Sequence, residues 1–273
     1  MSFWDNFRDK PHLIAAHRGN RSIRAENTMS AFKESLGKAD FIELDVNFTK
    51  DGVAVIIHDD TLLRTSNVTD NASFKKPYNV IDYTYDEINK LDFSTWFLKK
   101  DPFGMIKKEN LDKEVRSIEV QRISKLSEVL EFAKVNKMPL NIEIKDMSDT
   151  PFDDIAPKEV VNTIEELDIN DKVLISSFNH SYIKQVKKFS PSIDTAALEE
   201  NKVPSNIISY LQELKVSAYH PHLPLVTKEL VQTLSRHNLY TNVYTVNSSK
   251  IKDMLFNKGV KAIFTDYLEN MPK

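Results

Sequence analysis

Residues 41–59, FIELDVNFTKDGVAVIIHD, contain two apolar runs separated by Asp51 and Gly52. An Asp-Gly pair between two apolar runs is a strong signal for a two-residue β-hairpin turn. The stretch therefore predicts two antiparallel strands in which the numbers of facing residues sum to 103. This register places Asp45 opposite His58.

Short apolar and β-branched runs recur along the rest of the chain, and segments with helical periodicity separate most of them. Without the second strand of the hairpin, the predicted strands are 13–17, 41–46, 139–145, 172–178, 194–198, 216–220, 241–247 and 261–266. The predicted helices are 28–37, 126–135, 157–167, 181–189, 205–214, 227–237 and 249–259. Regular alternation of strands and helices, with eight strands, predicts an α/β protein whose parallel sheet closes into a (β/α)8, or TIM-type, barrel.

From about residue 60 to about residue 115 the alternation stops, and polar runs mix with aromatic residues. We interpret this stretch as a subdomain inserted after the second strand of a single barrel domain that spans 1–273. Long insertions in compact domains often cover a binding site, so the stretch is a candidate lid or specificity region. A purely stabilising excursion is the alternative.

The composition excludes several classes of protein. Of the 273 residues, 41% are hydrophobic, which is enough for a sizeable core, and the net charge of −3 provides no field that would recruit nucleic acid. The chain has no cysteine, which excludes disulfides, thiol catalysis and zinc–thiolate sites. We find no secretory signal pattern and no stretch long enough to span a membrane, so we expect a cytoplasmic protein without stable membrane insertion. A secreted protein whose signal has been removed is the alternative.

Three carboxylates are expected at the C-terminal mouth of the barrel. Glu43 and Asp45 stand two residues apart on one strand and point to the same side of it, and Glu143 and Lys145 repeat this spacing in NIEIK. Barrel strands are covered on both faces, so these charges point into the mouth. Glu43, Asp45 and Glu143 form an all-oxygen ligand set, which predicts one divalent cation, Mg2+ or Ca2+.

Two histidines are expected at the same mouth, since His17 closes the first strand and His58 closes the hairpin. Imidazoles titrate near neutral pH and can act as general acid and general base. Arg18 offers a planar fork for a phosphate, and Lys145 offers a point charge. Together with a cation, these groups predict phosphoryl chemistry on an anionic ester. Glu26 is expected to orient Arg18 or His17 from behind.

Other catalytic patterns are absent: there is no G-x-S-x-G, no phosphate-cradling P-loop and no G-x-G-x-x-G. His220 and His222 occur at a predicted strand end. They either line the mouth or belong to a loop shaped by proline, and we favour the loop.

The order and spacing of AHRG, ENT, IELDV, TKDG, VIIHD, LLRT, NIEIK, LISSF, YTVN and GVKAIFTDY resemble the glycerophosphodiester phosphodiesterase family over nearly the whole chain. The resemblance implies a (β/α)8 barrel that hydrolyses glycerophosphodiesters to glycerol 3-phosphate and an alcohol such as choline, ethanolamine or glycerol. It implies acid/base catalysis by His17 and His58, with a nucleophile that is either water or the substrate's own 2-hydroxyl. It also implies a metal held by Glu43, Asp45 and Glu143, with the phosphate bound by Arg18 and Lys145.

Two positions depart from the family pattern. Ala25 replaces the usual proline before Glu-Asn-Thr, and Tyr244 replaces the usual tryptophan at the mouth. These departures bear on substrate preference. The alternatives are a related phospholipase D-type barrel acting on lysophospholipids or sphingomyelin, and an inactive barrel that only binds. The motifs are compatible with several head groups, with either cation, with either assignment of roles to the two histidines and with any oligomeric state.

Overall fold

The fold is a closed barrel of eight parallel strands. The structure is a computed structural model, and it describes residues 2–108 and 120–271. The strands are β1 (Leu13–Ala16), β2 (Phe41–Phe48), β3 (Ala54–Ile56), β4 (Leu140–Ile144), β5 (Val173–Ser177), β6 (Asp194–Glu199), β7 (Ala218–Pro221), β8 (Tyr240–Val243) and β9 (Ala262–Thr265). Parallel pairing runs β1-β9-β8-β7-β6-β5-β4-β2, and β1 pairs with β2 to close the barrel. The predicted (β/α)8 barrel is confirmed.

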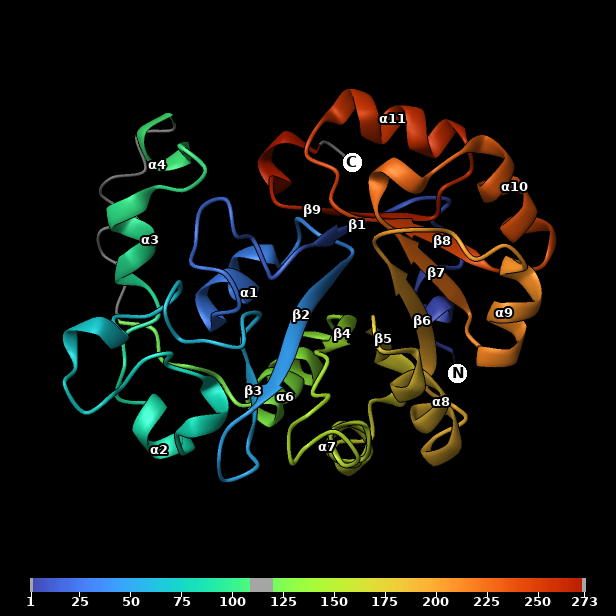
Figure 1. Ribbon diagram of the computed structural model, residues 1–273. Coiled ribbons are helices and arrows are strands. Elements are labelled where there is room, and N and C mark those ends of the chain that lie inside the picture. The colour runs from blue at the N-terminus through green and yellow to red at the C-terminus, as the bar shows by residue number, and fades with distance from the viewer. Residues whose placement is uncertain (1, 109–119, 272–273) are drawn as a thin grey trace.

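Helices connect successive strands and surround the barrel (Figure 1). They are α1 (Met29–Ser35), α6 (Leu126–Asn136), α7 (Ala156–Glu166), α8 (His180–Phe189), α9 (Ile207–Leu214), α10 (Lys228–Arg236) and α11 (Ser249–Asn257). Each predicted helix is present, with ends that shift by at most two residues. The short 3-10 helices η1 (Phe3–Phe7), η4 (Asn170–Lys172), η5 (Leu223–Leu225) and η6 (Leu268–Asn270) lie outside this alternation.

The hairpin forms, but its predicted register is wrong by one residue. β3 pairs antiparallel with β2, and Val46 faces Ile56, so the facing numbers sum to 102 instead of 103. The loop has three residues because Gly52 takes a φ of +78° and donates its backbone N–H to the Thr49 carbonyl at 2.9 Å. A left-handed glycine at the end of a three-residue loop is a common hairpin solution. Asp45 therefore faces position 57, and His58 lies one residue beyond the pairing.

In most barrel strands, successive residues belong to different hydrophobic clusters, as the strand period of two requires. One set points into the barrel and forms an apolar layer of Leu13, Ala15, Phe41, Leu174, Ala196, Ala218, Ala262 and Phe264. Phe3, Trp4 and Phe7 of η1 pack against this layer. The other set, such as Ile42 and Leu44, packs outward in a cluster that includes residues of the surrounding helices. The inward residues nearer the strand C-termini are then available for a site.

Between β3 and α6 the chain forms short elements instead of a strand and helix. They are η2 (Val68–Asp70), η3 (Val80–Asp82), α2 (Tyr85–Ile88), α3 (Thr95–Lys100) and α4 (Met105–Lys108). They lie to one side of the barrel, beside α1 and β3 (Figure 1). A separate hydrophobic cluster that includes Val55, Leu62 and Phe93 holds part of this stretch together. Residues 109–115 of the predicted insertion lie outside the described residues.

We predict that Gly52→Ala lowers the free energy of unfolding by about 1 kcal/mol, because an L-residue with a side chain is disfavoured at this positive φ. The variant Gly52→Asn is the matched control and should lose less, since asparagine tolerates the left-handed region. Urea unfolding measures both. An alanine variant as stable as the parent protein would contradict the three-residue loop.

Candidate active site at the barrel mouth

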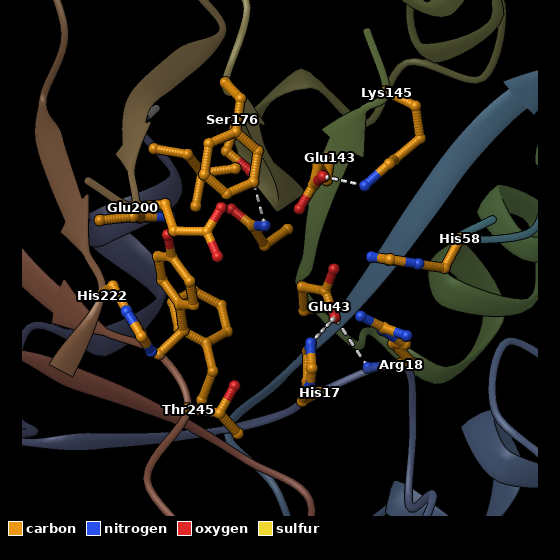
Figure 2. A pocket seen from close by; sticks show the side chains of 16 residues that line it. His17, Arg18, Glu43, His58, Glu143, Lys145, Ser176, Glu200, His222 and Thr245 are labelled. Atoms are coloured by element: carbon orange, nitrogen blue, oxygen red, sulfur yellow. Dashed lines mark hydrogen bonds and ion pairs between the residues drawn. The ribbon is translucent and has the colours of Figure 1, made fainter. Parts of the chain in front are cut away.

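A cavity of about 480 Å³ opens at the C-terminal ends of the barrel strands. The side chains that line it stand at the inward-facing strand positions, like those of the apolar layer. His17 stands two residues after Ala15, at the end of β1, and Glu43 stands two residues after Phe41 in β2. Glu143 likewise stands two residues after Asn141 in β4. In TIM-type barrels this end carries the functional residues. Figure 2 shows these side chains pointing into one pocket from different strands.

Glu43, Asp45 and Glu143 meet at this mouth. Each offers a carboxylate oxygen, and these oxygens all lie within 4.8 Å of one another. All three residues are at most 9% exposed. β2 and β4 are neighbours in register, with Asp45 paired to Glu143, which explains why side chains about 100 residues apart converge.

The burial of three like charges perturbs their ionisation. Burial, reinforced by Asp45 and Glu143, raises the pKa of Glu43 well above its ordinary value. Burial also raises the pKa of Glu143, against the opposing effect of Lys145. Burial acts in the same direction on Asp45, but Arg18 and Lys145 outweigh it and lower the pKa of Asp45 to about 2. The two neighbouring cations therefore do not fully offset the cost of burying three carboxylates together, and the cluster favours additional positive charge.

Arg18 and Lys145 flank the three carboxylates. The Arg18 backbone N–H donates to Glu43 Oε2 at 2.7 Å, and its Nε lies 3.4 Å from Asp45 Oδ2. Lys145 Nζ donates to Glu143 Oε1 at 2.7 Å and lies 3.8 Å from Asp45 Oδ1. Both side chains line the pocket. They can therefore meet an anionic ligand while they partly neutralise the acidic cluster.

His17 is fixed by a carboxylate at the end of β9. Its Nδ1 lies 2.7 Å from Asp266 Oδ1, and its Nε2 lies 4.0 Å from Glu43 Oε2. Burial and the nearby Arg18 lower the pKa of His17, although Asp266 opposes the shift. A neutral imidazole that donates Nδ1–H to Asp266 keeps the Nε2 lone pair on the pocket side. In that tautomer, Nε2 is the atom of His17 that can accept a proton.

His58 has an equivalent arrangement, since its Nδ1 lies 2.8 Å from Asp59 Oδ1. Asp59 in turn accepts two hydrogen bonds from Arg64, each 2.7 Å long. Arg64 also donates to both carboxylate oxygens of Glu26, at 2.9 and 2.7 Å. His58 is therefore connected through Asp59 and Arg64 to Glu26.

Glu26 also connects to the other histidine. Its Oε2 accepts a hydrogen bond of 2.5 Å from Arg21, which lies 3.2 Å from Asp266 Oδ1. Its Oε1 accepts a hydrogen bond of 2.9 Å from Arg18. Glu26 is therefore the centre of a continuous network that joins both histidines behind the pocket. The predicted contact with Arg18 is present, whereas the link to His17 runs through Arg21 and Asp266.

The loop between β1 and α1 has a strained backbone. Arg18, Gly19 and Asn27 have φ values of +56°, +79° and +55°. A Cβ atom at Gly19 would lie 2.8 Å from the Ala31 Cβ and 2.9 Å from its carbonyl carbon, so only glycine fits against α1 there. Asn27 uses its conformation to donate to Asp45 Oδ2 at 2.8 Å. The loop thus brings side chains of Arg18 and Asn27 to the acidic cluster.

Several pocket or network residues were not predicted from the sequence. His220 and His222 line the pocket, which is the alternative that the sequence left open for them, and His220 belongs to β7 rather than to a loop. Asp59 and Asp266, which orient the histidines, were also missed. Asp266 stands two residues beyond the inward-facing Phe264, and that alternation was a usable signal. No sequence signal connects Arg21 with Arg64.

A (β/α)8 barrel with an acidic cluster, two oriented histidines and two cations at its mouth has the groups needed for phosphoryl chemistry. Residues 17–270 match the model of the glycerophosphoryl diester phosphodiesterase family. A glycerophosphodiester phosphodiesterase of Bacillus altitudinis is 36% identical over 265 residues, which cover 95% of this chain and 96% of that relative. An enzyme of the same name from Caldanaerobacter subterraneus is 32% identical over 262 residues, which cover 95% of this chain and 96% of that relative.

Solved structures share the fold. The crystal structure of a glycerophosphodiester phosphodiesterase from Parabacteroides distasonis superposes with a TM-score of 0.73 at 22% identity, covering 95% of this chain and 94% of that one. A phosphodiesterase of Oleispira antarctica, in complex with the product sn-glycerol-3-phosphate, gives a TM-score of 0.76 at 22% identity, covering 98% of this chain and 97% of that one.

The chain belongs to the glycerophosphoryl diester phosphodiesterase family. Its class of enzyme is therefore that of the phosphoric diester hydrolases. Within residues 2–108 and 120–271, no helix combines the length and the apolar character needed to cross a membrane.

We predict that Glu26→Gln lowers the free energy of unfolding at pH 7 by about 3–5 kcal/mol, because it leaves three buried or half-buried arginines without their shared anion. Arg64, Arg21 and Arg18 outweigh the effect of burial and lower the pKa of Glu26 in the folded state. The stability from this carboxylate is therefore present above the unfolded pKa, about 4.3, and is lost as the pH falls below it. The difference in the free energy of unfolding between the parent protein and Glu26→Gln should therefore narrow below about pH 4.3.

Urea unfolding at intervals between pH 7 and about pH 3 measures this difference in the free energy of unfolding. Glu34→Gln is the matched control, because Glu34 pairs with Arg24 and Lys38 nearer the surface, and it should cost under about 1 kcal/mol. A difference in the free energy of unfolding between the parent protein and Glu26→Gln that stays constant or widens below about pH 4.3 would contradict the proposed network around Glu26.

Proposed function

We propose that the chain is a divalent-cation-dependent phosphodiesterase that hydrolyses glycerophosphodiesters to glycerol 3-phosphate and an alcohol. The observation that carries the proposal is the convergence, at the barrel mouth of a family member, of the three-carboxylate cluster with two histidines and two cationic side chains that line the pocket. The name of the Bacillus altitudinis relative and the product bound to the Oleispira antarctica enzyme support this class of substrate.

The acidic cluster fits one divalent cation. Two oxygens that bind one Ca2+ from opposite sides, each at about 2.4 Å, are separated by at most about 4.8 Å. The oxygens of Glu43, Asp45 and Glu143 lie within that span. An all-carboxylate set suits Mg2+ or Ca2+ rather than softer metals. When bound, the cation supplies Lewis-acid stabilisation of the charge on a non-bridging phosphate oxygen.

The histidines move the protons in this proposal. Neutral His17 accepts the proton of the attacking hydroxyl, either water or the neighbouring hydroxyl of the substrate, as its oxygen bonds to phosphorus. The bond from phosphorus to the alcohol oxygen breaks, and His58 gives its proton to that oxygen. Attack by the neighbouring hydroxyl leaves a cyclic phosphate. Water then opens this ring with the roles of the histidines reversed: His58 accepts a proton from the water, and His17 returns its proton to the hydroxyl oxygen that leaves phosphorus. The carboxylates of Asp266 and Asp59 hold the two rings in orientation.

Arg18 and Lys145 bind the phosphate in this proposal. Both are held at the pocket by buried carboxylates, so they need little reorganisation when an anion arrives. Their charges favour the dianionic transition state over the monoanionic diester, and this difference is what accelerates the reaction.

Activity separates this function from its alternatives. With Mg2+ or Ca2+, the purified chain should release glycerol 3-phosphate from glycerophosphoglycerol and glycerophosphocholine, and a chelator should abolish the release. Faster turnover of lysophosphatidylcholine or sphingomyelin would favour the phospholipase D-type alternative. No turnover of any diester with either cation would favour an inactive barrel.

We predict that His17→Ala and His58→Ala each lower kcat by about 10²–10⁴-fold, because each removes one proton transfer. Circular dichroism should show an unchanged fold. His237→Ala is the control, since His237 is exposed at the end of α10 and its side chain bonds the Thr233 carbonyl, away from the pocket. Either pocket variant with near-normal kcat would remove that histidine from the proposal.

We predict that Glu43→Gln weakens cation binding by at least about tenfold, because it removes one charged ligand. The readout is the rise in Tm with added Mg2+ or Ca2+, which follows the occupancy of a native-state site without any turnover. Glu34→Gln should keep the titration of the parent protein. An unchanged cation titration for Glu43→Gln would exclude this carboxylate as a ligand.

A further inference from the structure

The pocket has two chemically different sides (Figure 2). Arg18, His58 and Lys145 lie on the side of the acidic cluster, where the phosphate is proposed to bind. Glu200 and His222 lie on the opposite side. A pocket with cations at one side and a separate carboxylate at the other has the charge pattern of a zwitterionic ligand.

Glu200 points inward because of its strand parity. It stands two residues after Leu198, which also lines the pocket, at the C-terminal end of β6. The side chain of its neighbour Glu199 is used elsewhere, since it accepts hydrogen bonds from the backbone N–H groups of Asn201 and Lys202 at 3.0 and 3.3 Å. Glu200 is not part of the three-carboxylate cluster, so the proposed cation does not require it.

Aromatic rings accompany the Glu200 carboxylate. Phe178 and Tyr244 also line the pocket and meet edge to face, with ring centroids 6.0 Å apart. His222 stacks on Tyr244 at 5.5 Å. The hydroxyl of Tyr244 donates to the Glu199 carbonyl at 3.0 Å, which fixes the ring. Ring faces beside a carboxylate are the usual surroundings of a bound alkylammonium group.

Neutral hydroxyls have a different place to bind. Asn141 and His220 also line the pocket, and both are almost fully buried. Asn141 Nδ2 bonds Ser176, and His220 Nε2 bonds Asn242, whereas Asn141 Oδ1 and His220 Nδ1 have no hydrogen-bond partner in the described chain. These two buried atoms suit the hydroxyls of a polyol. The side with Glu200 and the rings is therefore left for the other half of a diester.

We propose that Phe178, Glu200 and Tyr244 form a subsite for a cationic alcohol, so that the chain prefers glycerophosphodiesters with an alkylammonium head group such as choline or ethanolamine. This inference rests on the proposed function. Glu200 attracts the positive charge, and the rings of Phe178 and Tyr244 cover the alkyl carbons. A neutral head group of the same size gains neither interaction.

The test compares kcat/KM for glycerophosphocholine and for the neutral-headed glycerophosphoglycerol in the parent protein, Glu200→Gln and Glu199→Gln. Glu200→Gln should lower kcat/KM for glycerophosphocholine by about five- to tenfold and change glycerophosphoglycerol by less than about twofold. The selectivity of the parent protein should fall as salt is raised, because salt screens a partly exposed charge. Glu199→Gln should leave both substrates unchanged.

Each other outcome overturns the inference. Equal losses on both substrates would mean that Glu200 contacts the glycerol half that they share. No loss on either would mean that the Glu200 carboxylate stays in solvent. If the parent protein hydrolyses neither substrate, the proposed function itself fails, and hydrolysis of glycerophosphoglycerol by all three proteins keeps these two failures apart.

Discussion

The repulsion among three buried carboxylates is the constraint on which the rest of the site depends. Glu43, Asp45 and Glu143 lie within 4.8 Å of one another at the barrel mouth. Like charges this close and this buried are costly without compensation. Arg18 and Lys145 supply part of it, yet the raised pKa values of Glu43 and Glu143 indicate a remaining deficit of positive charge. A divalent cation would remove that deficit, and the two cationic side chains would then be available to the substrate.

The strand period of two accounts for the composition of the pocket. Below the mouth, the inward residues of most strands are apolar and fill the barrel, and beyond that layer the same parity places polar side chains such as Glu43, Glu143 and Ser176 in the pocket. The turn at Gly19 after β1 and the hydrogen bonds of Glu26 then orient the arginines and histidines at the mouth. Glu26 helps to position both proposed proton-transfer groups, His17 and His58. Its partner Arg21 contacts Asp266, which bonds His17, and its partner Arg64 contacts Asp59, which bonds His58.

The sequence predicted the barrel and the residues that stand on its strands, because strand parity is a local property. It predicted the hairpin but placed Asp45 opposite His58, since an Asp-Gly pair does not reveal whether the loop has two or three residues. The convergence of His58 on the pocket was therefore expected for an incorrect reason. The link from Arg21 through Glu26 to Arg64 could not be predicted, because it depends on how two loops pack.

The most direct test of the account is a crystal structure of the chain grown with Mn2+ in place of Mg2+ or Ca2+, with the ion located by its anomalous scattering. The account predicts one ion between β2 and β4, bound by an oxygen of each of Glu43, Asp45 and Glu143 at about 2.1–2.4 Å. An ion bound elsewhere, or three carboxylates that remain unliganded in crystals of an active enzyme, would contradict it.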